Sequence, residues 1–362
     1  MPAAFMIFSG QPKQLGGCEI YRGTMPLTYL GQINGWTTGW AFYTDLLEEY
    51  KKHGKSFWAD FFYKNDVFIF PRMVLMPNAP TEVKMQIDAL FTAIRKSKKA
   101  VVYEVDDDFT NLHRRVTDGS AIDVASKCSA ISVTTPYLSR LMIKHTKRPC
   151  YILPNYVEGR LWHKPPEKRF YDTMLTIGLT GSPSHEKDWD VVAPAMHRLS
   201  RKYPNVKFVI GGYFPEYLSG IDSAEYIPGL PYDQYAELIK QCDVILAPVN
   251  PNDPFNMGKS PIKAVEGMSA ARTLPSGEVA GAAVIATRNP VYELAIQHEK
   301  TGLLVDHHTP EAWEAALERI ISDDGLRKHL QIKALARSKS HWTIESNAHR
   351  WGSAYLKVLK RG

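Results

Sequence analysis

Short apolar segments alternate with amphipathic segments along the second half of the chain. The apolar runs that predict buried strands cover residues 174–180, 206–211, 244–249, 282–287 and 302–305. Apolar residues every three or four positions predict helices over 187–202 and 233–241, from Pro261, near Tyr292 and from Thr309. Because strands and helices alternate, we expect an α/β fold with a parallel sheet covered on both faces.

The first half follows the same pattern with longer interruptions. Its predicted strands cover 3–8, 67–70, 101–105, 130–133 and 151–153, and its predicted helices cover 39–52, 81–98 and 136–144. Prolines and charges interrupt the periodicity over 154–166 and mark a domain boundary. We therefore expect two Rossmann-like domains, 1–155 and 156–339, facing across a cleft. An aromatic-rich helical segment, 340–362, is expected to pack back on the first domain.

Composition supports a globular protein with two domains. The 362 residues exceed the usual size of a single core, and 44% of them are hydrophobic. No stretch is long and apolar enough to cross a membrane, and the first residues lack the features of a secretion signal. Four cysteines without paired spacing indicate reduced thiols, a cytoplasmic protein and no metal site.

Positive charge is concentrated in the first half of the chain. The formal net charge is +6, and about five of these charges lie before residue 156. Clusters at Arg95–Lys99, Arg114–Arg115 and Lys144–Arg148 suit an anionic partner such as nucleic acid or a lipid headgroup. Solvated helix faces carry the same pattern, so both interpretations stay open.

The segment 258–266, Gly-Lys-Ser-Pro-Ile-Lys-Ala-Val-Glu, is the strongest functional motif. Ser260 is a favoured N-cap residue and Pro261 is favoured in the first helical turn, so a helix is expected to start here. The N-terminus of a helix attracts anions. Lys259 and Lys263 could neutralise a diphosphate, while Glu266 could accept hydrogen bonds from ribose hydroxyls. An ordinary capped helix with solvated lysines is the alternative.

Polar and glycine-rich segments also follow other predicted strands. Gly16 and Gly17 lie in the first strand-to-helix connection, where glycine backbone can approach a phosphate, although the dinucleotide fingerprint is missing. Gly181, Ser182 and His185 follow the strand that begins the second domain and could bind a sugar diphosphate or simply cap a helix.

Two further carboxylates, Asp106 and Asp107, end the strand predicted over 101–105. They could hold an acceptor hydroxyl, or they could cap a turn or a helix. Three successive aspartates, with Asp108, point in different directions and could not all bind one metal ion.

Taken in order, these segments resemble retaining glycosyltransferases of the GT-B fold, in particular a group common in bacteriophages and bacteria. The resemblance spans nearly the whole chain. The segments that carry it are Gly16-Gly17 with Tyr21-Arg22, Phe70-Pro71-Arg72, Val102–Asp108, Leu153-Pro154-Asn155, Thr180–His185 and Gly258–Glu266.

The resemblance implies transfer of a sugar from a nucleoside diphosphate sugar, with UDP as the first expectation, to a hydroxyl with retention of configuration. It implies no additional cofactor and no metal. Lys259 and Lys263 match the diphosphate ligands, and Asp107 is the third catalytic candidate. Glu266 matches the later of two glutamates that the family usually has, and Gly258 replaces the earlier one. The connection 272–281 is longer than is usual in the family.

The acceptor stays open at this point. Arg22, Arg72 and Asp106 are the candidates on the acceptor side. A hydroxymethylated base in phage DNA would suit the basic first domain, and would place the enzyme in the host cytoplasm. A surface glycan or a lipid-linked sugar would suit the same charges. Two other functions are kept as alternatives: a nucleotide-sugar epimerase of the same fold and a noncatalytic nucleic-acid-binding protein.

Overall fold

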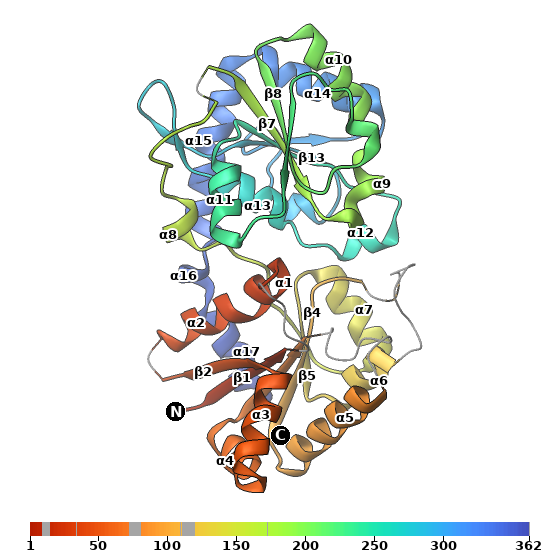
Figure 1. Ribbon diagram of the computed structural model, residues 1–362, viewed down its shortest axis with the longest axis vertical. Coiled ribbons are helices and arrows are strands. Elements are labelled where there is room, and N and C mark those ends of the chain that lie inside the picture. The colour runs from red at the N-terminus through yellow and green to blue at the C-terminus, as the bar shows by residue number, and fades with distance from the viewer. Residues whose placement is uncertain are drawn as a thin grey trace. The chain divides into compact units, whose positions relative to one another are not determined.

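The computed structural model describes residues 1–8, 15–33, 35–71, 81–108, 110, 120–171 and 173–361. Within them the chain forms two compact units (Figure 1). Unit 1 comprises Met1–Asn155, Gly258–Ser260 and Ile344–Gly362, and unit 2 comprises Tyr156–Met257 and Pro261–Thr343. No helix in the described part of the chain has the length and hydrophobicity needed to span a bilayer.

Unit 1 contains a six-stranded sheet in the order β2-β1-β3-β4-β5-β6, and all of its pairings are parallel. Its strands are β1 (Ala3–Phe8), β2 (Thr37–Phe42), β3 (Val67–Pro71), β4 (Ala100–Val105), β5 (Ala130–Val133) and β6 (Cys150–Ile152). Its longer helices are α2 (Met25–Gly31), α3 (Tyr43–His53), α4 (Lys55–Lys64), α5 (Thr81–Lys96), α6 (Ser120–Lys127), α7 (Pro136–Thr146) and α17 (His349–Leu359). Shorter segments are α1 (Gly17–Glu19), a π-helix (Ile20–Thr24) and α16 (Ile344–Asn347).

Alternate residues of these strands face two different layers of unit 1. Ile7, Phe68 and Tyr103 join a core with apolar residues of α3, α4, α5, α6 and α7. On the other face, a Cβ at Gly23, just before α2, would lie within 3 Å of Met6 and Phe8 side-chain atoms. Helices α16 and α17 both contact α2, so the C-terminal segment packs on unit 1 as predicted.

Unit 2 repeats the plan with the strand order β14-β13-β10-β7-β8-β9. Its strands are β7 (Leu175–Gly181), β8 (Val206–Gly212), β9 (Ala224–Pro228), β10 (Val244–Ala247), β13 (Ala283–Thr287) and β14 (Leu303–Val305), all parallel. Its helices are α8 (Gly159–Trp162), α9 (Glu186–Trp189), α10 (Ala193–Lys202), α11 (Tyr232–Lys240), α12 (Pro254–Gly258), α13 (Ile262–Ser269), α14 (Pro310–Ser322) and α15 (Asp324–His341). Single 3₁₀ turns cover Pro183–His185, Glu216–Leu218 and Tyr292–Leu294.

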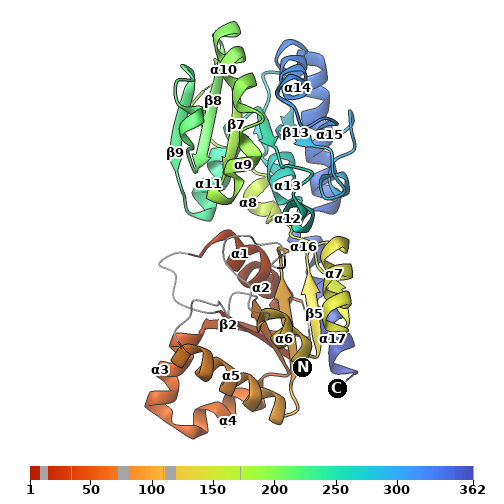
Figure 2. The same cartoon turned by 90° about the vertical axis from the view of Figure 1, so that its right-hand side faces the viewer.

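The sheet of unit 2 is covered on both faces (Figure 2). Val244 and Leu246 of β10 join a core with apolar residues of α10 and α14. Ile245 points to the opposite face, where a Cβ at Gly267 would lie 3.0 Å from the Ile245 Cβ. Glycine at this position therefore allows α13 to lie close against the strands. The predicted α/β fold with two parallel sheets is confirmed.

Several element predictions need correction. Residues 39–52 do not form one helix, because Thr37–Phe42 pairs with β1 as β2 and α3 starts at Tyr43. The helix predicted over 187–202 is two helices, α9 and α10, and Pro194 lies in the first turn of the second. Strand β9 and helix α4 were missed altogether. The helix predicted from Pro261 forms, but Pro261 itself is the N-cap, and no side chain caps the helix.

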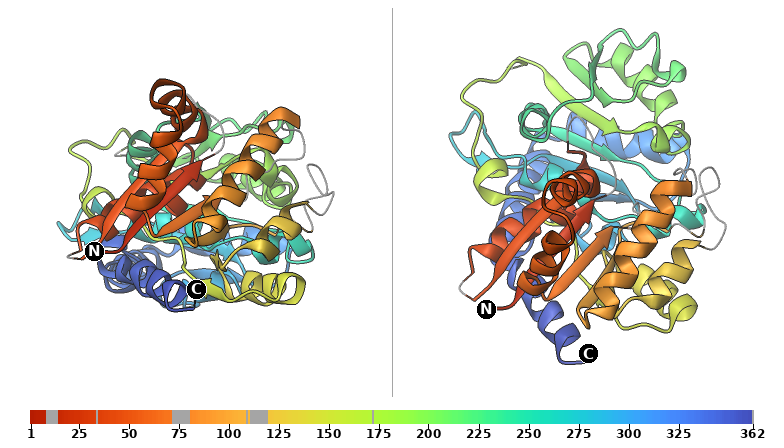
Figure 3. Two further views of the ribbon diagram at one scale, coloured as in Figure 1. Left: turned by 90° about the horizontal axis from the view of Figure 1, so that it is seen from below. Right: turned by 60° about the horizontal axis from the view of Figure 1, so that its bottom comes forward.

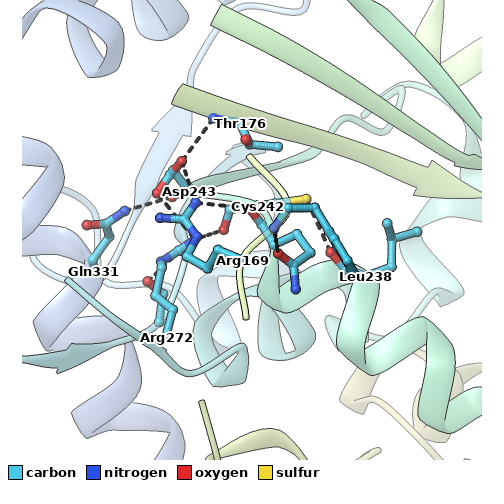
Figure 4. A network of polar contacts seen from close by, with 10 residues as sticks. Arg169, Thr176, Leu238, Cys242, Asp243, Arg272 and Gln331 are labelled. Atoms are coloured by element: carbon cyan, nitrogen blue, oxygen red, sulfur yellow. Dashed lines mark hydrogen bonds and ion pairs between the residues drawn. The ribbon is translucent and has the colours of Figure 1, made fainter. Parts of the chain in front are cut away.

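The long connection 272–281 forms a small hairpin at the amino edge of the unit 2 sheet. Its strands β11 (Arg272–Thr273) and β12 (Val279–Ala280) are antiparallel. The guanidinium of Arg272 is fully buried and donates to Cys242 O and, at 2.8 Å, to Gly281 O. Asp243 lies 3.5 Å from Arg272 and 3.1 Å from Arg169, and accepts a hydrogen bond from Thr176 N (Figure 4). Through Arg272, the hairpin therefore fixes the backbone just before the first residues of β10 and β13.

Candidate functional site

A compact polar cluster lies at the carboxyl edge of the unit 2 sheet. Its members are Thr180 near the end of β7, Tyr235 in the first half of α11, and Lys263 and Glu266 in α13. Ligands of parallel α/β sheets bind at this edge, because the strand ends and the helix N-termini meet there. We call these four residues the donor-edge cluster.

Tyr235 stands at the centre of the donor-edge cluster. Its hydroxyl donates to Glu266 Oε2 at 2.8 Å and accepts from Lys263 Nζ at 2.8 Å. Thr180 Oγ1 lies 3.0 Å from the same hydroxyl, and Lys263 Nζ lies 3.3 Å from Glu266 Oε2. The Lys263 ammonium also lies 4.7 Å from the Tyr235 ring centroid, within the range of a cation–π contact.

The cluster keeps a positive charge close to the start of α13. Burial acts to lower the pKa of Lys263, but the Glu266 carboxylate and the Tyr235 hydroxyl prevail, so that pKa is raised. Burial, with the Glu266 charge, raises the pKa of Tyr235. At neutral pH Lys263 is therefore a cation and Tyr235 a hydrogen-bond donor. The Lys263 side chain is 23% exposed while that of Glu266 is 4% exposed, so the lysine is the partly accessible member of the pair.

A second cluster of polar residues is centred on Asp188, at the same edge of the unit 2 sheet. Asp188 Oδ2 lies 3.1 Å from His185 Nδ1, and Oδ1 accepts from Asn250 N at 2.8 Å and Asn256 Nδ2 at 2.7 Å. The His185 ring is stacked on Trp189. Asp188 thus fixes both the turn after β7 and the loop after β10.

The other donor candidates of the β7 turn are less enclosed. Gly181 ends β7, and its carbonyl accepts from Tyr213 N at 3.0 Å. Ser182 is exposed, and its hydroxyl lies 2.9 Å from that of Ser184. Together with His185 these residues surround the carboxyl end of β7, as the sequence predicted.

The segment Gly258–Ser260 groups with unit 1. Ser260 does not cap α13; its hydroxyl accepts from Asn155 Nδ2 at 2.9 Å. Lys259 is half-buried in this segment. A Cβ at Gly258 would lie 2.7 Å from the backbone N of Asp108, so a glutamate could not take this position without a shift of the backbone. Glycine in place of the expected glutamate therefore has a steric reason.

The aspartates after β4 differ in their surroundings. Asp106 and Asp107 are half-buried, and the Asp106 carbonyl accepts from Thr134 Oγ1 at 3.4 Å. Asp108 is fully buried, and it accepts from Thr110 N at 3.0 Å and Tyr137 Oη at 3.0 Å. Asp108 is thus the carboxylate that shapes the turn. The described residues contain no group of three or more metal-ligating side chains.

Arg22 lies in the interior of unit 1. Its Nε and Nη2 donate to Glu104 Oε1 at 2.8 and 2.6 Å, and its Nη1 donates to Leu153 O and Asn155 Oδ1. Arg22 and Glu104 are each 2% exposed. The guanidinium expected on the acceptor side is therefore engaged in a buried network, which argues for a structural role. Arg72, the other basic acceptor candidate, lies outside the described residues.

The glycines near the first strand make a local cap. Gly16 is the N-cap of α1, and its backbone N donates to Glu19 Oε2 at 3.0 Å. Gly17 starts the helix. The Gly16 amide thus already has an acidic acceptor within the chain, whereas the sequence suggested a phosphate.

Residues 162–337 match the family model of glycosyl transferases group 1. The matched stretch contains all four members of the donor-edge cluster and the residues around Asp188. Tyr235, Asp188 and Asn256 were missed as site residues from the sequence.

Solved structures with the GT-B fold match over the whole chain. Sucrose-phosphate synthase from Thermosynechococcus elongatus is 15% identical, with a TM-score of 0.70, and each chain is covered fully. HepE of Anabaena in complex with UDP is 14% identical, with a TM-score of 0.68, and the match covers 99% of this chain and 100% of that one. A glycosyltransferase from Rickettsia africae is 14% identical, with a TM-score of 0.68 and coverage of 100% and 99%. A search of curated proteins by sequence gave no match.

Proposed function

We propose that the protein transfers a sugar from UDP-sugar to an acceptor hydroxyl, with retention of configuration, and that the donor-edge cluster binds the nucleotide. The observation that carries this proposal is the Lys263–Tyr235–Glu266 contact within the stretch that matches the group 1 family model. UDP is the first choice of nucleotide because HepE of Anabaena was solved with UDP and with UDP-glucose.

The geometry supports complementary tasks for the members of the cluster. The buried carboxylate of Glu266 is fixed by Tyr235 and Lys263, which suits acceptance of hydrogen bonds from ribose hydroxyls. The partly accessible cation of Lys263, near the start of α13, suits a diphosphate. We propose that Lys259 assists with the second phosphate, and that Gly181, Ser182 and His185 contact the diphosphate and the sugar.

In the proposed reaction the bond between the sugar C1 and the diphosphate oxygen breaks. The acceptor oxygen forms the new bond to C1 from the same face, and its proton passes to the departing diphosphate. Negative charge grows on the diphosphate as the bond breaks, so a positioned cation lowers the barrier. We assign this role to Lys263 and Lys259. No additional cofactor enters this scheme.

For the acceptor we propose the hydroxyl of a glycan rather than a hydroxymethylated DNA base. The described basic clusters lie in the last turns of α5 and α7 and just after them, at the edge of the unit 1 sheet where strands begin. Acceptors of α/β proteins are expected at the opposite edge, where Asp106 and Asp107 lie. We retain these two aspartates as acceptor contacts.

A panel of ligands tests the proposal. Thermal unfolding is measured with UDP, GDP and ADP and then with UDP-glucose and UDP-N-acetylglucosamine. A ligand that binds only the folded state at a hundredfold excess over Kd stabilises it by about 2.7 kcal/mol. We expect UDP to stabilise the wild type and Glu237→Gln alike, but Glu266→Gln much less. Glu237 is half-exposed on α11 and serves as the matched control.

Product analysis separates the remaining alternatives. Incubation with a donor that stabilises the protein, and with an oligosaccharide acceptor, should yield a product whose anomeric configuration equals that of the donor by NMR. An epimerised donor formed without acceptor would indicate the epimerase. Transfer to hydroxymethylated DNA but not to glycans would overturn the acceptor choice. Stabilisation by none of the nucleotides would contradict the donor site itself.

A further inference from the structure

The amino edge of the unit 1 sheet carries an unusually strong positive charge. Helices α5, α6 and α7 all end at this edge, because β4, β5 and β6 begin shortly after them. The cations in their last turns and in the following connections are Arg95, Lys96, Lys98, Lys99, Lys127, Lys144, Lys147 and Arg148. Most of them are exposed. Lys64, at the end of α4, precedes β3 at the same edge.

The C-terminus adds two more cations to this edge. Arg350, near the start of α17, contacts the carbonyl of Ile152 at the carboxyl end of β6. Tyr355, further along the helix, packs on Trp36, which directly precedes β2. Helix α17 therefore runs from the carboxyl edge to the amino edge, and brings Lys360 and Arg361 there. The left panel of Figure 3 views unit 1 from the side of both termini. We call this set of cations the basic edge.

Unit 2 provides an internal control for the basic edge. Helix C-termini favour cations for dipole reasons in any α/β sheet, so some positive charge is expected at both amino edges. In unit 2 one cation in the last turn of each of α10, α11 and α14 pairs with a carboxylate. These pairs are Lys202–Glu318, Lys240–Glu237 and Arg319–Glu299. The helix dipole alone therefore does not require an excess of cations.

In unit 1 few cations of the basic edge pair with a carboxylate. Lys64 pairs with Asp60 and Lys99 pairs with Asp66. Among the described residues, no ion pair is found for Lys98, Lys144 or Lys147. The resulting excess of positive charge persists on one side of one unit. Such a surface attracts an anionic partner over a distance of about 8–10 Å at physiological salt.

Exposed apolar side chains accompany the basic edge. Tyr63 is 84% exposed beside Lys64, and Ile143 is 45% exposed in the last turn of α7. Leu356 is 42% exposed in the last turn of α17. Ile143 and Leu356 each lie four residues before a lysine, Lys147 and Lys360, that ends the same helix as its C-cap. Tyrosine and apolar residues next to lysines are typical of surfaces that lie at a lipid headgroup layer.

We propose that the basic edge of unit 1 docks on an anionic phospholipid surface. Lysines reach the headgroups, and the exposed side chains of Tyr63, Ile143 and Leu356 enter the interface. A tightly coordinated phosphate site is not expected, because helix C-termini present carbonyl oxygens, which repel anions at close range. Attraction is instead spread over many long side chains, as suits a charged surface. The proposal does not depend on the identity of the donor or acceptor.

Vesicle sedimentation tests the proposal with the full chain. The vesicles contain phosphatidylcholine with 30% phosphatidylglycerol, or phosphatidylcholine alone, at about 0.1 M salt. Each lysine near an anionic surface contributes about fivefold to partitioning. We expect the wild type to bind the anionic vesicles and not the neutral ones. The variant K96Q/K98Q/K144Q/K147Q should bind at least tenfold more weakly.

A matched variant controls for net charge. K164Q/K168Q/K300Q/K339Q removes four exposed cations from unit 2 and should bind within about twofold of the wild type. Circular dichroism and thermal unfolding verify that both variants fold. Equal weakening by both variants would show a net-charge effect and would overturn a specific surface. Undiminished binding by the unit 1 variant would overturn it as well.

A third comparison distinguishes lipid from nucleic acid. Ile143→Ser should lower vesicle binding at least twofold and leave binding to a DNA duplex unchanged, because only the bilayer offers an apolar phase to Ile143. Tighter binding to duplex DNA than to anionic vesicles, with no effect of Ile143→Ser on either, would assign the basic edge to nucleic acid and contradict the proposal.

Discussion

The two units have the same type of parallel sheet, and each contains a buried ion pair. The surroundings of these two pairs differ. In unit 1, Arg22 and Glu104 are each 2% exposed, and every polar group of the guanidinium has a partner inside the unit. In unit 2, Lys263 is 23% exposed above a Glu266 side chain that is 4% exposed. A closed pair leaves no contact for a ligand, whereas an open pair can exchange part of its contacts for one.

The difference arises from the parts of the chain that surround each pair. Arg22 is held by the end of β6 through Leu153 and Asn155, and its guanidinium carbon lies 5.9 Å from the Trp351 ring centroid in α17. The C-terminal segment therefore closes the pair in unit 1. The pair in unit 2 stands on the first turns of α13, at a sheet edge where helices begin. We conclude that fold alone does not decide the role of a buried charge.

Loss of Arg22 should give the largest effect. Arg22→Met leaves the Glu104 carboxylate buried without its cation, and we expect unit 1 to lose about 3–5 kcal/mol at pH 8. Hydrogen exchange of β4 peptides under increasing urea measures this locally. The double variant Arg22→Met/Glu104→Met should recover much of the loss. Arg95→Met, at an exposed position, is the control, and wild-type exchange in Arg22→Met would contradict the closed-pair description.

Loss of the cation in the open pair should affect turnover more than folding. Lys263→Met removes a charge that we place at the departing diphosphate, so kcat should fall by about 10²- to 10³-fold. Steady-state kinetics with UDP-sugar measure the change, and Lys300→Met provides an exposed lysine as control. Unfolding temperature should change far less than in Arg22→Met. A kcat within threefold of the wild type would remove Lys263 from the reaction.

Removal of the central hydroxyl should have an intermediate effect. Tyr235→Phe keeps the ring under Lys263 but deprives Glu266 of a hydrogen bond. A hydrogen bond to a charged group contributes about 1.5–3 kcal/mol, so the donor KM should rise by about tenfold or more. Tyr226→Phe, at a half-exposed position on β9, is the matched variant. Equal KM values in Tyr235→Phe and the wild type would show that Glu266 needs no such support.

The last prediction concerns the pH dependence of unit 1. Burial raises the pKa of Glu104 from 4.5 to about 7, although Arg22 and the Ser132 hydroxyl act against it. Between these two pH values the folded protein holds a proton that the unfolded chain has released. Stability should therefore decrease as the pH rises from about 4.5 to about 7. Urea unfolding at pH 5 and pH 8 measures this, and Glu104→Gln should lose most of the difference.

Much of this architecture could be predicted from local sequence, and the exceptions have local causes. Runs such as 130–133 and 206–211 are mostly apolar, as is typical of buried parallel strands, and they were located within a residue or two. Thr37–Phe42 has polar residues, a glycine and aromatics, and its place beside β1 depends on tertiary pairing. The break between α9 and α10 follows from Pro194.

Only those contacts of the candidate site that join residues close in sequence could be predicted. Lys263 and Glu266 are three residues apart on one helix, so the sequence placed them together. Tyr235 lies on α11, and its contact with both residues depends on the packing of α11 against α13, which no spacing reveals. The burial of Arg22 could not be predicted for the same reason, because its partners Glu104 and Asn155 are distant in sequence.

Calorimetric titration with UDP tests the central claim most directly, since it asks whether the open pair binds a nucleotide diphosphate. The proteins compared are the wild type, Glu266→Gln and the surface control Glu237→Gln, all at pH 7.5. We predict one UDP per chain for the wild type and Glu237→Gln with similar Kd, and a Kd at least tenfold higher for Glu266→Gln. Equal affinity in all three proteins, or no heat of binding in the wild type, would contradict the claim.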